Sequence, residues 1–520
     1  MSGSTVQILI AMCSYMAVVI GIGIFFAKRA NKNSENYFLG GRSLGPWVAA
    51  MSAEASDMSG WLLMGLPGVA YWCGIADAGW TAIGLAVGTY INWLLVAKPL
   101  RRYSQVTNAI TVPDFFSNRF KENKKVIMTI SSVFILVFFA VYAGSCFVTC
   151  GKLFSRLFGA DYRLMMVIGA LFVLLYTFLG GFLAESASDF MQAVVMIFAL
   201  ITVLFVGISA AGGFSAVAEN AAGIPGFATF FGIAQPEVDS AGMQLIGSDG
   251  APLFGAAGDY GFLTIISTLS WGLGYFGVPQ VLLRFMAIRT SREIKKSRRI
   301  ATVWCVISLT AAVTIGVVGR ALLPTAFQTE SGAENIFVQM ASVLMHPLFA
   351  GVVMAGVLAA TISSSDSYLL IAASAFSKNI FQGLLKKNAT DKQVMRVSRI
   401  TLVAVAVIGM VIALDEDSVI FTLVSFAWAG FGATFGPLML FSLFWKRINR
   451  AGAIAGMLTG GITVFVWKLL LNPLGGVFAI YELFPAFVFS CIAIVAVSLL
   501  TKEPSKEIQE EFEAAKTIEC

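Results

Sequence analysis

Long apolar segments alternate with short polar segments along almost the whole chain. A helix needs about 20 mostly apolar residues to cross the hydrocarbon core of a bilayer, and we expect thirteen of these segments to be spans. They cover about residues 6–27, 47–72, 76–97, 125–150, 162–181, 188–211, 261–283, 301–323, 347–377, 399–414, 418–444, 451–471 and 476–500. The pattern predicts an all-α polytopic protein with about thirteen transmembrane helices in a lipid bilayer.

The composition agrees with this class and excludes a soluble globular protein. Of the 520 residues, 58% are hydrophobic and 12% are charged. The seven cysteines show no metal-like clustering, so we interpret them as small core residues and expect no disulfide framework. The first apolar segment, 6–27, has the length of a spanning helix rather than that of a signal-peptide core.

Basic residues mark alternate loops, as expected when the cytoplasmic loops hold the excess of Lys and Arg. They follow spans one, three, seven, nine and eleven: Lys28, Arg29, Lys32 and Arg42; Arg101, Arg102, Arg119, Lys121, Lys124 and Lys125; Arg284, Arg289, Arg292, Lys295, Lys296, Arg298 and Arg299; Lys378, Lys386, Lys387, Lys392, Arg396 and Arg399; Lys446, Arg447 and Arg450. We interpret these runs as topology signals rather than nucleic-acid sites.

The intervening loops should then face outward. The longest of them, about Ala211 to Tyr260, contains acidic residues but no Lys or Arg, whereas Lys152 and Arg156 are a mild exception in another outer loop. The chain should therefore lie in the cell (plasma) membrane with its N-terminus outside and a cytoplasmic tail over residues 501–520.

The second apolar segment contains a carboxylate, Asp57. At the centre of a bilayer a carboxylate costs about 2.5–3.5 kcal/mol on insertion scales, so an intramembrane Asp usually faces a partner, a cavity or an ion. Small and helix-breaking residues surround it, namely Ser56, Ser59, Gly60, Gly65, Pro67 and Gly68. We expect the helix to open here and to free backbone carbonyls; the alternative is a kinked, packed helix with a structurally satisfied Asp.

Span seven is also interrupted, because residues 270–279 contain three Gly and one Pro. It lies five crossings after span two, and an odd separation reverses the direction of entry. Paired broken helices in two inverted halves point to a transporter binding site near the midplane. The domains predicted in this way are an extra helix and loop (1–46), a first repeat (47–211), an outer loop (212–260), a second repeat (261–445), two further helices (446–500) and the tail (501–520).

Span nine carries a dense group of hydroxyls over residues 361–367. Helical spacing places Ser363, Asp366 and Ser367 on one face, where oxygen ligands would suit an alkali cation. The alternative is hydrogen bonding to the preceding turn or to a neighbouring helix. Asp189, which we place at the start of span six, is either a further functional carboxylate or a solvated helix-end residue.

Several motifs carry a resemblance to a known family. They are LGGRSLGP (39–46), ASDMSGWLLMGLPG (55–68), YTFLGGF (176–182), WGLGYFG (271–277) and WAGFGA (428–433). Through them most of the chain resembles the sodium/solute symporter family. The resemblance implies a LeuT-like core of five plus five inverted spans, with one extra helix before it and two after. It also implies sodium-coupled import of L-proline by alternating access; the alternative is another small zwitterion or a different ion stoichiometry.

The resemblance further implies site residues. A sodium ion would be held by the carbonyls of Ala55, Met58 and Ala360 and the hydroxyls of Ser363 and Ser364, with Asp57 needed for coupling. The residues expected to line the proline pocket are Ser59, Gly60, Trp61, Tyr142, Trp271, Tyr275 and Pro279. Aromatic faces suit a pyrrolidine ring, and the N–H groups of a broken helix suit a carboxylate; each ring could instead be core packing.

The chain also departs from the family pattern at three acids, Glu54, Glu185 and Asp366. In family members with a second sodium site, the position of Asp366 helps to hold that ion together with the counterpart of Asp189. We therefore predict a second cation site from Asp189, Ser363, Asp366 and Ser367, occupied by sodium or filled by protonation; a structural pairing of Asp366 is the alternative.

Other classes of protein are disfavoured. No repeated filter-like loop suggests a channel. An enzyme or sensor is not expected, because the single histidine, His346, adjoins a proline at a helix boundary, the tail is too short for a signalling domain and no phosphate-binding loop is found.

Overall fold

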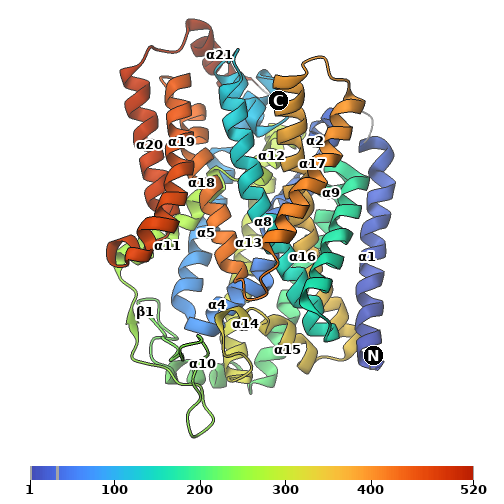
Figure 1. The fold of residues 1–520 in the computed structure, drawn as a ribbon, viewed down its shortest axis with the longest axis vertical. Coiled ribbons are helices and arrows are strands. Elements are labelled where there is room, and N and C mark those ends of the chain that lie inside the picture. The colour runs from blue at the N-terminus through green and yellow to red at the C-terminus, as the bar shows by residue number, and fades with distance from the viewer. Residues whose placement is uncertain (1–2, 31–33, 519–520) are drawn as a thin grey trace.

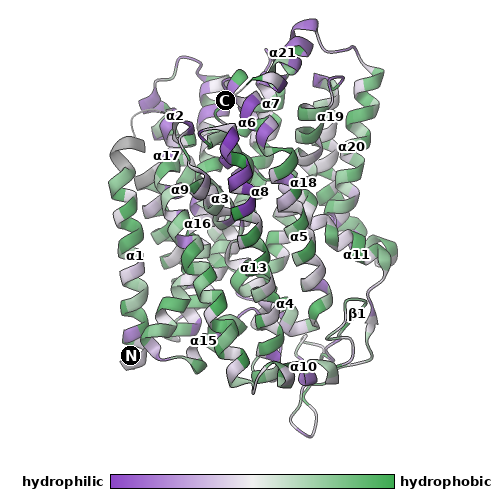
Figure 2. Cartoon of the chain, turned by 180° about the vertical axis from the view of Figure 1, so that it is seen from behind, coloured by the Kyte–Doolittle hydropathy of each residue, from purple (hydrophilic) through white to green (hydrophobic). Residues whose placement is uncertain are grey.

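The computed structural model describes residues 3–30 and 34–518. Lys28, Arg29 and Lys32 of the first basic loop lie outside the residues whose side chains are described. The helices run side by side in one bundle, with the N-terminus at one end and the C-terminus at the other (Figure 1). Apolar residues cover the middle of the bundle and polar residues concentrate towards its ends (Figure 2).

The structure confirms a membrane protein with about thirteen spans. Among the described residues nine helices are long and apolar enough to cross a membrane, or up to eleven if two bent helix pairs are each one span. Two shorter apolar helices, Trp61–Cys73 and Tyr162–Phe178, correspond to the remaining predicted spans.

The spanning elements follow the predicted order. They are α1 (Gly3–Ala30), α3 (Pro46–Asp57) with α4 (Leu66–Cys73), α5 (Ile75–Leu95) with α6 (Ala97–Val106), α8 (Val126–Phe158), α9 (Tyr162–Ala210), α11 (Phe262–Leu269) with α12 (Pro279–Ala287), α13 (Ile294–Leu322), α16 (Pro347–Ser374), α17 (Asp391–Ile412), α18 (Ile420–Phe444), α19 (Arg450–Val466) and α20 (Leu483–Leu500). The predicted boundaries of span four and span ten were too short, because α8 continues to Phe158 and α17 begins at Asp391.

Spans five and six are two helices that meet directly at a sharp kink, and they are labelled together as α9. The chain changes direction at Gly181, whose φ of 55° and ψ of −171° lie outside the helical region. A positive φ is readily adopted only by glycine. A side chain at Gly181 would also meet Tyr37 of the short helix α2 (Ser34–Leu39). As a result Asp189 lies well inside the second half of α9 and is fully buried, so the alternative of a solvated helix end is wrong.

Both predicted interruptions are present. Between α3 and α4 the chain leaves the α-helix at Met58, and Trp61–Gly65 forms a π-helical turn. Between α11 and α12 the residues Ser270–Phe276 form a 3₁₀-helix, and the segment Phe262–Phe276 is bent by 41° against Pro279–Ala287. These breaks leave backbone groups without helical partners inside the bundle, which is where a binding site needs them.

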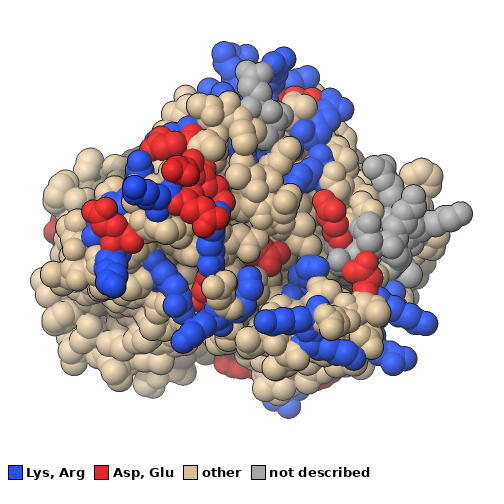
Figure 3. Space-filling view, turned by 90° about the horizontal axis from the view of Figure 1, so that it is seen from above, with Lys and Arg blue, Asp and Glu red and all other residues tan. Residues whose placement is uncertain are grey.

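Short elements cover the two ends of the bundle. At the end that carries the N-terminus lie α10 (Phe214–Gly223), the antiparallel strands β1 (Gly232–Ile233) and β2 (Gly258–Asp259), α14 (Glu330–Ala333) and α15 (Ile336–Leu344) (Figure 1). The opposite end carries α2, α7 (Val112–Arg119) and the tail helix α21 (Lys506–Thr517) (Figure 2). Lys and Arg side chains spread over this second end (Figure 3).

The tail helix α21 is docked on that basic end. Lys121 lies 2.5 Å from Glu507 and 3.2 Å from Glu511, and Glu507 raises the pKa of the lysine. Phe512 is buried against Tyr103 and against the guanidinium of Arg119. Arg119 is itself fully buried, so its interpretation as a loop charge that only sets topology was incomplete.

Candidate functional site

The end of α3 exposes a backbone carbonyl to the centre of the bundle. The carbonyl oxygen of Asp57 accepts hydrogen bonds from the Trp61 indole and the Tyr142 hydroxyl, each at 3.3 Å. Thr149 of α8 packs against Gly60 so closely that a side chain at this position would collide with it. Four residues predicted from the sequence therefore meet at this break, namely Asp57, Gly60, Trp61 and Tyr142. They can meet because the glycine lets α8 approach the backbone.

Four of the five residues predicted to hold sodium also meet. The hydroxyls of Ser363 and Ser364 donate to the Ala55 carbonyl at 2.8 and 3.2 Å, and Ser363 also reaches the Ala360 carbonyl at 3.2 Å. Two carbonyls and two hydroxyls thus converge between α3 and α16. Met58, the fifth, is the buried residue directly after the end of α3. Neutral oxygens arranged in this way can coordinate an alkali cation by exchanging hydrogen bonds for ion contacts.

The Asp57 side chain is buried and unpartnered. Neither carboxylate oxygen has a hydrogen-bond partner among the described residues, and the residue is 0% exposed. The hydroxyl of Tyr275 is an electrostatic neighbour of this carboxylate, although it makes no hydrogen bond of good geometry. Burying a carboxylate without a partner is costly, so this position favours the presence of a cation nearby.

Three of the predicted aromatic residues form one cluster beside the break. The rings of Trp61 and Trp271 are 6.1 Å apart, and Trp428 lies 6.2 Å from Trp271 and 5.1 Å from Tyr275. The Trp428 indole donates to the Trp271 carbonyl at 2.8 Å, which ties α18 to the 3₁₀-helix of the second broken span. Phe421 also packs on Trp271, at 5.2 Å.

Trp428 and Phe421 were not among the predicted pocket residues. Trp428 does belong to the WAGFGA motif, so the signal for it was present in the sequence. Tyr142 lies in a neighbouring stack, with its ring 4.2 Å from that of Tyr368. Pro279 begins α12 and lines a small cavity with Phe38 of α2 and with residues of α7, α8 and α16, and no other predicted pocket residue lines this cavity.

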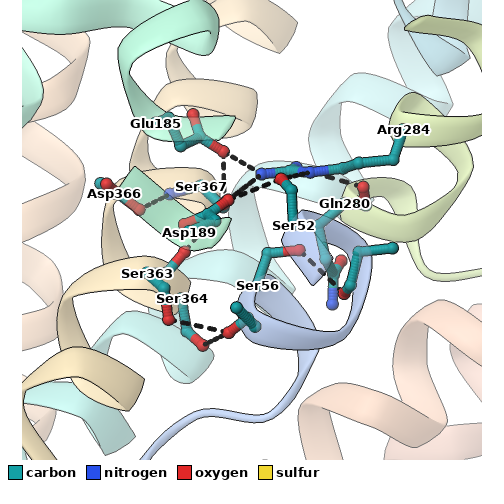
Figure 4. A network of polar contacts seen from close by, with 12 residues as sticks. Ser52, Ser56, Glu185, Asp189, Gln280, Arg284, Ser363, Ser364, Asp366 and Ser367 are labelled. Carbon is teal, nitrogen blue, oxygen red and sulfur yellow. Dashed lines mark hydrogen bonds and ion pairs between the residues drawn. The ribbon is translucent and has the colours of Figure 1, made fainter. Parts of the chain in front are cut away.

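Two residues of the predicted second cation site, Asp189 and Ser367, contact a buried arginine, Arg284 (Figure 4). Its guanidinium contacts Glu185 and Asp189 of α9, the latter at 3.2 Å, and the hydroxyl of Ser367 at 2.8 Å. It also donates to Ser52 of α3 at 3.0 Å. The sequence placed Arg284 among the cytoplasmic loop charges, and this was wrong because α12 carries the side chain into the bundle, where it is 0% exposed.

Asp366 lies at the edge of this network. One carboxylate oxygen accepts the N–H of Ser367 at 2.7 Å, and the other has no partner among the described residues. Asp366 and Glu185 line a small cavity of about 10 Å³ beside Tyr176 and Gly181, which is room for about one water-sized particle.

Two further buried acids have different surroundings. Glu54, one turn before Asp57, accepts the Thr89 hydroxyl at 3.0 Å and leaves its second oxygen unpartnered. Glu334 pairs with Lys152 at 2.7 Å and also accepts the N–H groups of Ile420 and Phe421 at the start of α18. The exception to the charge pattern at Lys152 is therefore a buried ion pair that holds elements together, rather than a loop charge.

Comparisons with known proteins agree on one family. The model of the sodium:solute symporter family matches residues 37–460. The sodium/proline symporter of Escherichia coli (strain K12) is 41% identical over 512 residues, which covers 98% of this chain and 96% of the relative. The sodium/proline symporter of Staphylococcus aureus (strain USA300) is 38% identical over 519 residues, which covers 98% and 96%.

Solved structures agree on the fold. A Na⁺-coupled sialic acid symporter in a substrate-bound outward-open state superposes with a TM-score of 0.75 at 19% identity, covering 96% of this chain and 99% of that one. Mhp1, a nucleobase-cation-symport-1 family transporter, superposes with a TM-score of 0.55 at 12% identity, covering 93% and 100%. This similarity of fold confirms the predicted core of five plus five inverted spans.

Proposed function

This chain belongs to the sodium:solute symporter family, and on that premise we propose that it is a sodium-coupled symporter that imports L-proline. Relatives named as sodium/proline symporters match it over nearly its whole length. The observation in the structure that carries the proposal is the convergence of the Ser363 and Ser364 hydroxyls on the Ala55 carbonyl at the end of α3. These oxygens would serve as sodium ligands at the same break of α3 that is followed by Trp61 of the aromatic cluster.

We assign the sodium ion to Ala55, Met58, Ala360, Ser363 and Ser364. The carbonyls belong to helix α3 of the predicted first repeat and helix α16 of the second, so a bound ion would join the two repeats. Asp57, two residues after Ala55, supplies a buried carboxylate whose two oxygens have no partner among the described residues. An ion that stabilises the open end of α3 also fixes the carbonyl of Asp57, to which Trp61 and Tyr142 donate. Sodium binding would in this way organise the neighbouring solute pocket.

We assign the solute pocket to Ser59, Gly60, Trp61, Tyr142, Trp271, Tyr275 and Pro279, and add Trp428. The indole and phenol faces present apolar area to a pyrrolidine ring. The second half of the broken span begins at Trp61, and the backbone N–H groups and positive dipole end at this start suit the solute carboxylate. The unpartnered Ser59 hydroxyl can donate to the same group.

Transport then follows by alternating access. The ion and the solute bind at the interface of two bundles of helices, and movement of one bundle against the other exposes the site to either side in turn. The basic end in Figure 3 would face the cytoplasm, with the N-terminus outside and the chain in the plasma membrane. Another small zwitterion remains the alternative solute, since Glu54, Glu185 and Asp366 depart from the family pattern.

Uptake of radiolabelled L-proline into proteoliposomes tests the proposal. An inward sodium gradient should drive accumulation, and replacing sodium by choline should abolish it. Competition by unlabelled L-proline, D-proline and betaine identifies the solute. Sodium-driven accumulation of radiolabelled betaine by a protein that does not accumulate L-proline would replace proline by the alternative solute, whereas L-proline accumulation that is unchanged without sodium would exclude the symport mechanism.

A further inference from the structure

The guanidinium of Arg284 lies inside a shell of oxygen atoms from three elements. Glu185 and Asp189 come from α9, Ser367 from α16 and Ser52 from α3, as Figure 4 shows. A fifth oxygen is the carbonyl of Gln280, one turn earlier on α12, at 3.2 Å. Each of the three guanidinium nitrogens thus donates a hydrogen bond to at least one oxygen of the described residues.

Two of the residues that supply these oxygens, Asp189 and Ser367, belong to the predicted second cation site. The Asp189 oxygen that contacts Arg284 also accepts the Ser52 hydroxyl at 2.6 Å. The Ser367 hydroxyl accepts a hydrogen bond from Arg284 and directs its single proton towards Glu185 and the Ser363 carbonyl, so its proton and one of its two lone pairs are engaged. A free sodium ion would have to compete with the guanidinium for the same oxygens.

We propose that Arg284 is a tethered cation that takes the place of a second coupling ion, so that this symporter moves one sodium ion per proline. The inference rests on the proposed function and refines its ion stoichiometry. A guanidinium is always charged and its planar fork fits paired carboxylates, so it can balance Glu185 and Asp189 throughout the transport cycle without being released.

The acids nearby make the proposal testable. With the charge of Arg284 removed, Glu185, Asp189 and Asp366 are three buried carboxylates with no cationic partner among the described residues. Asp366 already presents a free oxygen to the cavity it shares with Glu185. Such an arrangement should attract an external cation, because uncompensated buried carboxylates are costly.

The experiment counts ions in two ways. Equilibrium binding of radioactive sodium to purified protein gives the number of ions per chain, and the reversal potential of proline-coupled current in proteoliposomes gives the charge moved per proline. Wild type should bind one sodium ion and move one elementary charge, because zwitterionic proline carries none. Arg284→Gln should bind two ions, whereas Arg284→Lys, which keeps the charge, should stay at one.

A double variant guards against misfolding of Arg284→Gln. Arg284→Gln with Glu185→Gln removes one charge of each sign, so the network keeps its net charge and should still bind a second ion through Asp189 and Asp366. Two sodium ions bound by wild type, or one bound by folded Arg284→Gln and by the double variant, would overturn the inference. Absence of proline uptake by wild type would refute the proposed function instead, since the sodium count does not depend on it.

Discussion

Replacing Ser363 by alanine should weaken sodium binding far more than it weakens the fold. The Ser363 hydroxyl is the group that reaches both carbonyls of the assigned ion site, at 2.8 Å from Ala55 and 3.2 Å from Ala360. Without the ion the variant loses one hydrogen bond within the membrane, worth about 0.6–1 kcal/mol. With the ion it loses an oxygen ligand to a charge, worth about 1.5–3 kcal/mol, or roughly 10- to 150-fold in affinity.

The assay is the sodium concentration for half-maximal L-proline uptake, together with sodium-dependent protection against thermal unfolding. Ser365→Ala is the matched control, because Ser365 is equally buried on α16 but bonds back to the Thr361 carbonyl of its own helix. Ser364→Thr is a second control, since it keeps the hydroxyl. If folded Ser363→Ala and Ser365→Ala require the same sodium concentration, the ion does not bind where we place it.

Three further predictions concern Asp57, the aromatic residues of the proposed pocket and the buried Lys152–Glu334 ion pair. Asp57→Asn should lose most sodium-driven uptake, and the sodium concentration for half-maximal uptake should rise before the affinity for proline falls. Unchanged sodium dependence in a folded protein would contradict the coupling role. Trp271→Ala and Tyr142→Ala should weaken proline binding at saturating sodium by about tenfold or more, as measured by equilibrium binding, and normal affinity in both would remove these rings from the pocket. Lys152→Met should destabilise the protein by about 3–5 kcal/mol in thermal unfolding, because it leaves Glu334 buried without its partner, whereas combining it with Glu334→Gln should restore much of the loss.

The sequence predicted the membrane class, the number and order of the spans and the two broken helices. These features depend on local composition, such as runs of apolar residues and clusters of Gly and Pro within a few residues. The cluster of Ser and Thr residues in span nine and the carboxylate Asp57 could be identified for the same reason. Their roles remain proposals, but the structure does bring Ser363, Ser364 and Ala55 together across about 310 residues of sequence.

Hydropathy could not distinguish charges in loops from charges inside the bundle. Arg284 stands close to the end of an apolar segment and is followed by Arg289 and Arg292, so it reads as part of a cytoplasmic run. Whether such a side chain enters the bundle depends on the bend between α11 and α12 and on the acids that α9 presents. Lys152 gave the same difficulty, because its partner Glu334 is 182 positions away.

The sequence by itself therefore determined which segments cross the membrane and where their helices break, because spacing and composition act over a few turns. Only the tertiary structure decided which oxygens face one another, which rings pack against Trp428, and that Arg284 lies between Glu185 and Asp189. Those outcomes depend on how separate helices pack, and packing pairs residues that are distant in the chain and carry no local signal of their partners.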